Sequence, residues 1–472
     1  MSSTATSHDT LRSRQICLAV LVLILVSAVM LRAAMAVIVD RSAQQAGRSF
    51  LVEGDANGYW ELAEKLAAGE DYSIHQPARQ VLRVPGFPLL LAATIKVFGN
   101  SILAARFVLA CVGTACCLLT FLLATQLFNR KVGLVAAGFL AVHPLQIANS
   151  VLILSETWFT FWMLLSLISF TTFFKRFCHS DGQHPAGSET ASKANRSQTP
   201  PEKTLFGRIT KTNIDLRRAA LLSGGLIGIT VLVRPGFLPW VGFCVPAILL
   251  CHNRSWTSRL LQSALLVIGC LLIMMPWALR NQKATGHFVL TSLWSGPSLY
   301  DGLNPTATGA SDMTFFDEEQ VMNRMSEYEM NQHYSQRAVQ YALDNPGRAI
   351  ELGFRKAGLY LMPVPNFVKS RSWAGSVICL GFWLLLFVGV IASLSRLCRT
   401  VFRGQSRDSA LILLITVGPF LLFLLVHLAF VGSVRYRLPI EFPLTILSVH
   451  GWLAVIFGSR SVSKSSVAPH GH

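Results

Sequence analysis

Long apolar runs separated by short charged segments dominate the pattern of this chain. Runs long enough to cross about 30 Å of hydrocarbon as helices occur at 16–39, 101–128, 132–148, 157–174, 260–278, 374–395, 409–431 and 438–458. Two shorter runs, 219–233 and 237–251, flank Arg234-Pro235-Gly236 and indicate a tight helical hairpin. The pattern therefore predicts an all-α polytopic membrane protein with ten spans.

Composition agrees with this class and fixes an orientation. Hydrophobic residues make up 52% of the 472 positions and charged residues only 14%, which is more apolar surface than a water-soluble chain can bury. If the N-terminus is cytoplasmic, the segments on its side carry 21 basic and six acidic residues, as the positive-inside rule expects. The net charge of +17 then reflects topology, and we do not expect nucleic-acid binding. Both termini are predicted to be cytoplasmic.

The first apolar run also has features of a signal peptide, because small residues surround Ala36. The run is longer than a typical signal-peptide core, which favours an uncleaved first helix. Cleavage near Ala36 would leave the downstream acidic loop in place. All ten cysteines lie in or next to spans, and the segments 40–100 and 280–372 contain none, so no disulfide framework is predicted. No Cys or His spacing resembles a zinc site, and His143, ahead of Pro144, fits a hydrogen-bonding residue at a helix end better than a ligand.

Loop composition divides the chain into three parts. Residues 1–279 form an N-terminal bundle with an external first loop at 40–100 and a polar, flexible cytoplasmic linker at 178–213; residues 280–373 form an external cap; residues 374–472 form C-terminal spans and a short tail. The first loop contains an amphipathic helix that carries Tyr59 and Leu62 on its apolar face and ends at Gly69. In the cap we expect a short strand at 287–292, a helix within 317–343, a break at Asn345-Pro346 and a second helix through Tyr360.

Candidate chemistry lies on the external side. Asp55 follows the first span, and Glu156 begins the fourth, so the two carboxylates have the chance to converge between helices. One carboxylate would accept a proton from an attacking hydroxyl or amine, while a phosphate leaving group would need nearby cations. Five arginines fall at external span ends, where they are costly unless an anion meets them: Arg83, Arg234, Arg280, Arg435 and Arg437. With Tyr59, these are the candidate substrate-binding residues, and a polyprenyl phosphate suits them.

Simpler interpretations remain open for each residue alone. Asp55 has the position of an N-cap for the helix that contains Tyr59, and Glu156 or Ser155 has the position of a cap for the fourth span. Arginines at span ends often extend toward the interface or anchor loops. Arg234-Pro235-Gly236 and Pro85-Gly86 also fit proline-initiated helix starts. The shared side and depth of these residues favours the functional interpretation.

Several landmarks together resemble the GT-C superfamily of polytopic glycosyltransferases, and within it the bacterial relatives of protein O-mannosyltransferases and lipid A aminoarabinose transferases. In chain order they are Asp55-Ala56-Asn57-Gly58-Tyr59, the RVPGFPLLL stretch from Arg83 to Leu91, His143-Pro144, Ser155-Glu156-Thr157, PWALRN from Pro276 to Asn281, GHFVL from Gly286 to Leu290, and RYRLP from Arg435 to Pro439. The resemblance implies a GT-C-like bundle of about ten transmembrane helices with a small, mostly helical periplasmic cap.

The resemblance also implies an inverting transferase in the inner membrane that moves a sugar from a polyprenyl-phosphate donor to a lipid, glycan or protein acceptor. The family's first-loop acid maps onto Asp55 as the base and its second-loop acid onto Glu156. Its basic residue before the first-loop proline maps onto Arg83, which stands two positions before Pro85 rather than next to it. A single first-loop acid, where protein mannosyltransferases often carry an Asp-Glu pair, argues against protein O-mannosylation. Members differ in needing a divalent cation, so that requirement stays open and no metal ligand is assigned.

Two other functional classes remain. A polytopic transporter or flippase of a cell-envelope precursor would also have about ten spans, but it is expected to place charged or glycine-broken positions near mid-membrane. A non-catalytic scaffold would need no aligned acid and cation. Substituting Asp55 and Glu156 separates these classes from the enzyme.

Overall fold

Helices form nearly all of the regular structure in the computed structural model, which describes residues 3–179, 203–364, 372–403 and 407–458. Within these residues, eight helices are long and apolar enough to cross a membrane. Their apolar segments are Ser13–Gln45, Ile102–Leu127, Glu156–Cys178, Asp215–Val233, Trp256–Thr285, Trp373–Phe402, Asp408–Ala429 and Val434–Ile456. The chain is a multi-pass membrane protein.

Two of the ten expected spans are shorter than predicted. The 132–148 run is divided between α5 (Arg130–Val142) and α6 (Pro144–Asn149), because Pro144 disfavours a helical backbone at His143, which is extended at ψ 117°. The 237–251 run is the 3-10 turn η1 (Pro235–Trp240) continued by α9 (Val241–Leu249). The 13 residues of α5 reach about 20 Å, less than the thickness of the hydrocarbon layer.

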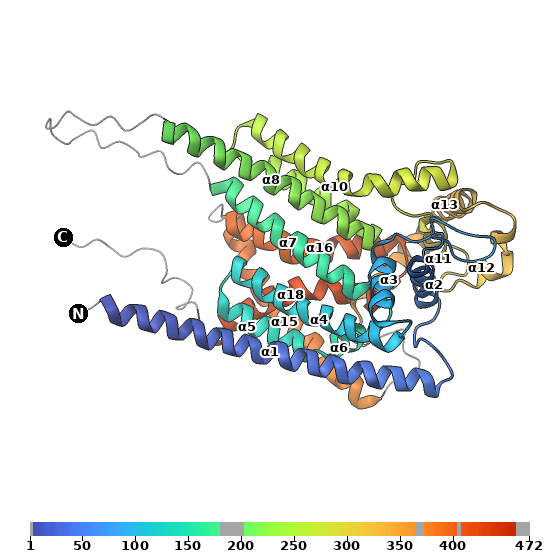
Figure 1. The fold of residues 1–472 in the computed structure, drawn as a ribbon, viewed down its shortest axis with the longest axis horizontal. Helices are drawn as coiled ribbons and strands as arrows, with labels where there is room; N and C mark the ends of the chain where they lie inside the picture. The colour runs from blue at the N-terminus through green and yellow to red at the C-terminus, as the bar shows by residue number, and fades with distance from the viewer. Residues whose placement is uncertain (1–2, 180–202, 365–371, 404–406, 459–472) are drawn as a thin grey trace.

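The long helices lie side by side along the horizontal axis of Figure 1. Helix α1 (Ser3–Gln45) follows one flank, and α8 (Lys203–Val233) and α10 (Trp256–Thr285) follow the other. Between them lie α4 (Ile102–Leu127), α7 (Glu156–His179), α15 (Trp373–Phe402), α16 (Arg407–Ala429) and α18 (Glu441–Ile456). The short elements α17 (Val434–Arg437) and η3 (Leu438–Ile440) join α16 to α18.

One end of the bundle, at the right of Figure 1, is covered by two parts of the chain and is called the capped end here. The first loop contributes α2 (Asp55–Ala68) and α3 (Gly86–Phe98). The later segment contributes α11 (Ser295–Gly302), α12 (Thr314–Glu319), η2 (Val321–Asn323), α13 (Glu327–Asp344) and α14 (Pro346–Leu361). Leu62, Tyr72 and Leu82 of the first loop share one apolar cluster with Tyr300, Tyr334 and Leu352 of the cap, so the two parts are packed together.

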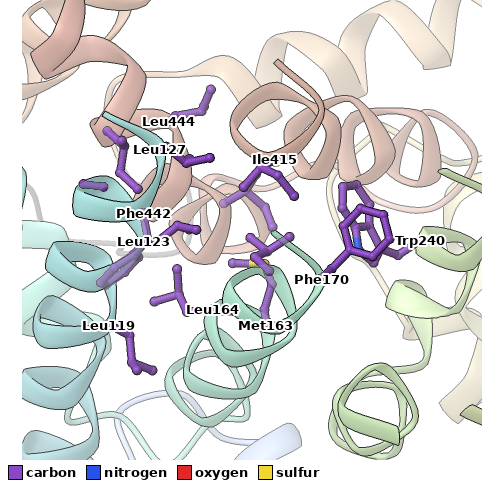
Figure 2. Packing of buried hydrophobic residues seen from close by; sticks show 14 of the residues in the cluster. Leu119, Leu123, Leu127, Met163, Leu164, Phe170, Trp240, Ile415, Phe442 and Leu444 are labelled. Carbon is purple, nitrogen blue, oxygen red and sulfur yellow. The ribbon is translucent and has the colours of Figure 1, made fainter. Parts of the chain in front are cut away.

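The bundle interior is filled by large apolar side chains from several helices. Figure 2 shows leucines of α4 facing Met163, Leu164 and Phe170 of α7, with Trp240 and Ile415 beside them. Glycines let some helices approach more closely than side chains allow: a Cβ on Gly224 of α8 would lie 1.9 Å from the carbonyl oxygen of Leu266 on α10. Small residues at helix contacts are the usual basis of tight packing between spans.

The predicted local elements can be compared with those observed. The amphipathic helix of the first loop is confirmed as α2, and Gly69 ends it with a positive φ of 78°. The break at Asn345-Pro346 is confirmed between α13 and α14. The strand expected at 287–292 is wrong, because this segment is not in a strand. The carbonyls of Val289 and Thr291 instead accept side-chain hydrogen bonds from Asn281.

The expected linker is also too long at its second end. Helix α8 begins at Lys203, so residues 203–213 are helical, and residues 180–202 lie outside the described part of the chain. The last proline before the span is Pro201, and no later residue prevents the helix of the span from continuing toward its N-terminus.

Candidate active site

Asp55 is the first residue of α2 at the capped end, and its carboxylate faces arginines rather than the helix backbone. Gly54 occupies the N-cap position, and no side chain caps this helix. Asp55 Oδ1 accepts from Arg83 Nη2 at 2.8 Å, and Oδ2 accepts from Arg435 Nη2 at 2.8 Å. The geometry therefore does not support the N-cap interpretation of Asp55.

Glu156 is the first residue of α7 and is fully buried. Its Oε1 pairs with Arg435 Nε and lies 3.4 Å from Arg234 Nη1, whereas Oε2 has no hydrogen-bond partner in the structure. A buried carboxylate is stable only where cations or donors compensate it. The two guanidinium groups therefore account for the charge of Glu156, and one of its oxygens is left for another donor.

Arg435 joins the two acids. Its Nε and Nη2 point to Glu156 and Asp55 respectively, so one planar guanidinium bridges residues from two loops that are far apart in sequence. Local structure aims this side chain: Ser433 caps α17 by accepting from the Arg435 amide, and the short α17 turns the chain into α18. The side chain of Arg435 is only 12% exposed, which favours strong ion pairing.

The first loop brings Arg83 to this point by close packing. A Cβ on Gly86 would lie 2.6 Å from the carbonyl oxygen of Leu232, so the Pro85-Gly86 turn sits directly against the end of α8, two residues before Arg234. The indole of Trp158 on α7 donates to the Gly86 carbonyl at 3.0 Å. The RVPG segment, α7 and the end of α8 are thereby held together.

Aromatic rings support the arginines. Arg83 lies over the ring of Tyr59, 4.6 Å from its centroid, and Tyr59 packs edge-on against Phe87. Arg234 lies over Tyr436 at 5.0 Å, and Tyr436 stacks on His427 at 4.3 Å. Tyr436 was not among the predicted site residues, although it stands between two of them in the RYRLP landmark. Stacked guanidinium groups keep a fixed orientation, which suits recognition of a flat or tetrahedral anion.

The arginines keep Asp55 ionised. Burial alone would raise the pKa of its carboxyl, but the charges of Arg83 and Arg435, with their hydrogen bonds, hold that pKa well below its ordinary value of 3.8. Burial would likewise lower the pKa of Arg83, and the charge of Asp55 raises it above its ordinary value instead. In this arrangement Asp55 is a carboxylate at every physiological pH.

Two of the predicted binding arginines lie outside this cluster. Arg280 donates to the backbone carbonyls of Gln80 and Tyr72, at 2.5 and 2.9 Å, and stacks against Trp277, so it holds the first loop on α10. Arg437 is 1% exposed and pairs with Glu441 at 2.8 Å. The guanidinium groups of Arg280 and Arg437 are therefore both engaged by acceptors of the protein, and both point away from the cluster.

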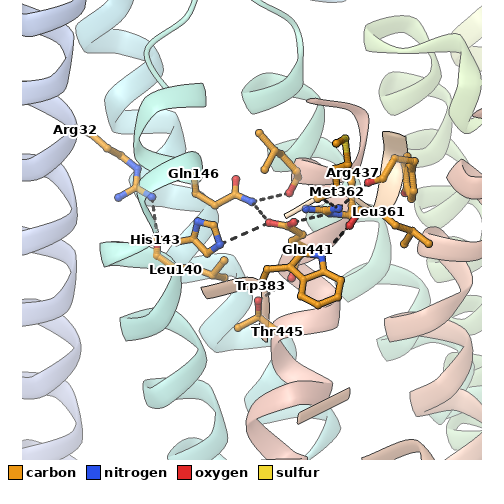
Figure 3. A network of polar contacts seen from close by, with 12 residues as sticks. Arg32, Leu140, His143, Gln146, Leu361, Met362, Trp383, Arg437, Glu441 and Thr445 are labelled. Atoms are coloured by element: carbon orange, nitrogen blue, oxygen red, sulfur yellow. Dashed lines mark hydrogen bonds and ion pairs between the residues drawn. The ribbon is translucent and has the colours of Figure 1, made fainter. Parts of the chain in front are cut away.

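Arg437 belongs to a second buried polar network, which Figure 3 shows between α5, α6 and α18. Glu441 accepts from Arg437 Nε and from Gln146 Nε2, at 2.8 and 2.9 Å, and lies 3.8 Å from His143 Nε2. Arg437 also donates to the carbonyls of Tyr360 and Met362 at the end of α14. Residues Gln146 and Glu441 carried no sequence signal, because single polar residues inside apolar runs have many explanations. The network ties α14 of the cap to the bundle.

A divalent ion does not fit the cluster as it stands. Among the described residues, no group of three or more His, Cys, Asp or Glu side chains is arranged to hold a metal ion. The space between Asp55 and Glu156, where two carboxylates would share a cation, is occupied by the guanidinium of Arg435. The geometry therefore assigns no residue of the cluster a metal-binding role.

Comparison with known proteins gives a partial sequence match and a fold. Residues 78–179 match the family described as dolichyl-phosphate-mannose-protein mannosyltransferase, a stretch that contains Arg83 and Glu156 but not Asp55 or Arg435. No curated protein matches the sequence.

Solved structures match over most of the chain at low identity. The oligosaccharyltransferase of Archaeoglobus fulgidus tethered to an acceptor peptide matches with a TM-score of 0.56 and 17% identity over 93% of this chain and 49% of its own. The AglB oligosaccharyltransferase of the same organism, in complex with an inhibitory peptide and a dolichol-phosphate, matches with a TM-score of 0.55 and 16% identity. That match covers 97% of this chain and 53% of its own. ArnT of Cupriavidus metallidurans, bound to undecaprenyl phosphate, matches with a TM-score of 0.42 and 15% identity. That match covers 92% of this chain and 78% of its own.

The chain spans about half the length of these archaeal enzymes. Their likeness extends along the whole helical bundle, while the family match lies on the segment that joins the first loop to α7. The chain thus has the fold of these membrane oligosaccharyltransferases, and residues 78–179 carry the sequence likeness to the mannosyltransferase family.

Proposed function

We propose that the protein transfers a sugar from a polyprenyl-phosphate donor to an acceptor hydroxyl or amine at its capped end, with inversion. The observation that carries this proposal is the linked cluster in which Arg435 bridges Asp55 and Glu156. A carboxylate that acts as base must lie close to cations that receive the leaving phosphate, and here both kinds of group occupy one cluster. The proposed location is the inner membrane, with the capped end in the periplasm.

The charge of the cluster favours an anionic substrate. Three guanidinium groups, of Arg83, Arg234 and Arg435, face two carboxylates, of Asp55 and Glu156, which leaves one positive charge in excess. An uncompensated cation beside lipid is costly, and a phosphate that arrives from the bilayer would neutralise it. The donor phosphate is therefore expected to bind between Arg83 and Arg435.

Phosphate binding also explains how Asp55 becomes a base. With two arginines paired to it, the carboxylate has a lowered pKa and little tendency to accept a proton. A phosphate that shares Arg83 and Arg435 would weaken both ion pairs and raise the pKa of Asp55. The acceptor's proton could then move to Asp55 as its oxygen or nitrogen forms a bond to the sugar carbon, and the bonding pair of the leaving oxygen stays on the phosphate. Glu156, whose second oxygen has no partner, keeps Arg435 in place.

An apolar groove between α14 and α16 is a candidate site for the carrier chain. Ile350, Gly353 and Phe354 of α14 and Leu425 and Leu428 of α16 line an apolar groove of about 480 Å³. On α16, His427 lies between the groove residues Leu425 and Leu428 and stacks on Tyr436, whose ring Arg234 covers, so an isoprenoid chain in the groove would have its phosphate near the cluster. We propose that chain as the occupant. Gly353→Phe should fill the groove and raise KM for the donor, whereas Gly347→Phe, also in open space on α14, should not.

Direct transfer by purified protein tests the function. The full chain in liposomes would be given polyprenyl-phosphate sugars extracted from the host envelope, and loss of donor and gain of glycosylated product would be followed by mass spectrometry. Asp55→Asn and Glu156→Gln should abolish transfer at normal membrane yield. Unchanged transfer in both variants would contradict the assignment of the acids. Movement of intact lipid-linked sugar between leaflets, with no transfer, would indicate a flippase instead.

The acceptor can be identified in cells. Comparison of envelope glycolipids and glycoproteins from a deletion strain with those of the complemented strain would show one glycosylated species missing. Complementation with Asp55→Asn should leave it missing. If every glycan mass persists in the deletion strain, the protein has another role.

A further inference from the structure

Two cysteines from distant parts of the chain meet at the end of the bundle opposite the cap. Cys178 lies in the last turn of α7, and Cys251 follows α9. Their Sγ atoms are 2.9 Å apart, closer than ordinary contact between two sulfur atoms but longer than the roughly 2.05 Å of a disulfide bond. No local sequence pattern pairs them, because 73 residues separate them.

Independent contacts hold the two segments in this register. Arg254, in the turn after Cys251, donates from Nε to the carbonyl of Phe177 at 2.6 Å and lies over the Phe177 ring. The turn itself is closed by Arg259, which donates to the carbonyls of Leu249 and Arg254. Cys178 is the next residue after Phe177, so the approach of the sulfur atoms follows from the packing of this turn on α7.

The surroundings also favour reaction. Cys178 is partly exposed while Cys251 is buried, so one sulfur can be reached by a reagent and the other is held behind it.

We propose that Cys178 and Cys251 form an oxidisable pair that closes into an intrachain disulfide. The oxidant would be a small-molecule disulfide of the glutathione class. The Cys178 thiolate attacks one of its sulfur atoms, forms a mixed disulfide and releases one small thiol. The Cys251 thiolate then attacks the Cys178 sulfur and displaces the second small thiol. One disulfide oxidant is consumed, and two small thiols are produced.

The cross-link would act on the elements that carry the candidate site. Helix α7 contains Glu156 at one end and Cys178 at the other, and the η1–α9 segment runs from Arg234 to Cys251. The disulfide would therefore join, at the opposite end, the same two segments that the Glu156–Arg234 ion pair joins at the capped end. On the predicted topology this end is cytoplasmic, where thiols are normally kept reduced. The pair is then expected to be reduced in growing cells and to close under oxidative stress.

The test uses the purified full chain in detergent. After treatment with oxidised glutathione or with dithiothreitol, remaining thiols would be alkylated and peptides analysed by mass spectrometry. Oxidation should give a linked pair of peptides containing Cys178 and Cys251, and should remove two of the ten alkylatable thiols. Cys178→Ser and Cys251→Ser should each eliminate the linked peptides. Cys244→Ser, which changes a buried cysteine elsewhere on α9, should leave them unchanged.

An experiment with the wild-type chain alone can also contradict the proposal. If oxidised glutathione modifies Cys398, which is also partly exposed, while Cys178 and Cys251 remain separately alkylated or carry only glutathione, the pair does not close and the proposal is wrong. Transfer activity is not needed for this test, so its outcome is independent of the proposed function.

Discussion

Arg435 and Glu156 are 279 residues apart in the sequence, and their side chains form the buried ion pair at the centre of the candidate site. The same guanidinium reaches Asp55, so α17, the start of α7 and the start of α2 meet at one residue. Chemistry at this point depends on the fit of a single planar group between two acids.

Arg435→Lys should reduce kcat/KM for transfer by about 100-fold, because a lysine ammonium cannot place two divergent donors on Glu156 and Asp55 together. The measurement is the liposome transfer assay at several donor concentrations. Arg355→Lys provides a matched control, because Arg355 is an exposed arginine on α14 that pairs with Glu351 away from the cluster. Equal activity of Arg435→Lys and wild type would show that the bridge is not needed.

Acid should remove the contribution of Asp55 to stability. Its native pKa is lowered, so the stabilising ion pairs are fully present above the unfolded value of 3.8 and are lost as the pH falls through the lower native value. The difference in Tm between wild type and Asp55→Asn should be constant from pH 5 to 8 and should shrink below about pH 4. Fluorescence-detected unfolding in detergent measures it. A difference that grows toward acid would contradict the pairing.

Glu441→Gln should lower the free energy of unfolding by about 3–5 kcal/mol, because Arg437 is left buried without an opposite charge. Both side chains are at most 3% exposed, so water cannot compensate. The double variant Arg437→Met with Glu441→Leu should recover much of the loss, since it removes both charges. Thermal unfolding of wild type, Arg437→Met, Glu441→Leu and the double variant completes the cycle, and additive effects would show that the two residues act independently.

Gly224→Ala should destabilise the contact between α8 and α10 by about 1–3 kcal/mol or more, because the added methyl meets the backbone of Leu266 at 1.9 Å. Gly242→Ala, in a helix with no atom within 4 Å of the added methyl, should leave Tm unchanged or slightly raised. Yield and Tm in detergent report the difference. Similar values for the two variants would mean that α8 and α10 do not pack this closely.

Local patterns of residues are sufficient to predict the class of the protein and the position of most helices. Apolar runs of span length exclude a soluble fold whatever their neighbours do, and Gly69 and Asn345-Pro346 end helices through local backbone preferences. Elements that depend on their surroundings were less predictable. The extended segment at 287–292 has strand-like composition, but it pairs with the Asn281 side chain instead of another strand.

Which polar residues lie together depends on the packing of segments that are far apart in the chain. Sequence placed five arginines at one depth, and packing brought Arg83, Arg234 and Arg435 to the acids while turning Arg280 toward the first loop and Arg437 toward Glu441. The direction of a side chain depends on helix rotation and on contacts such as Gly86 against Leu232, which join residues far apart in the chain. The depth of a residue along the membrane normal follows from its place in its own apolar run. The direction of its side chain within the membrane plane depends on the neighbouring helices.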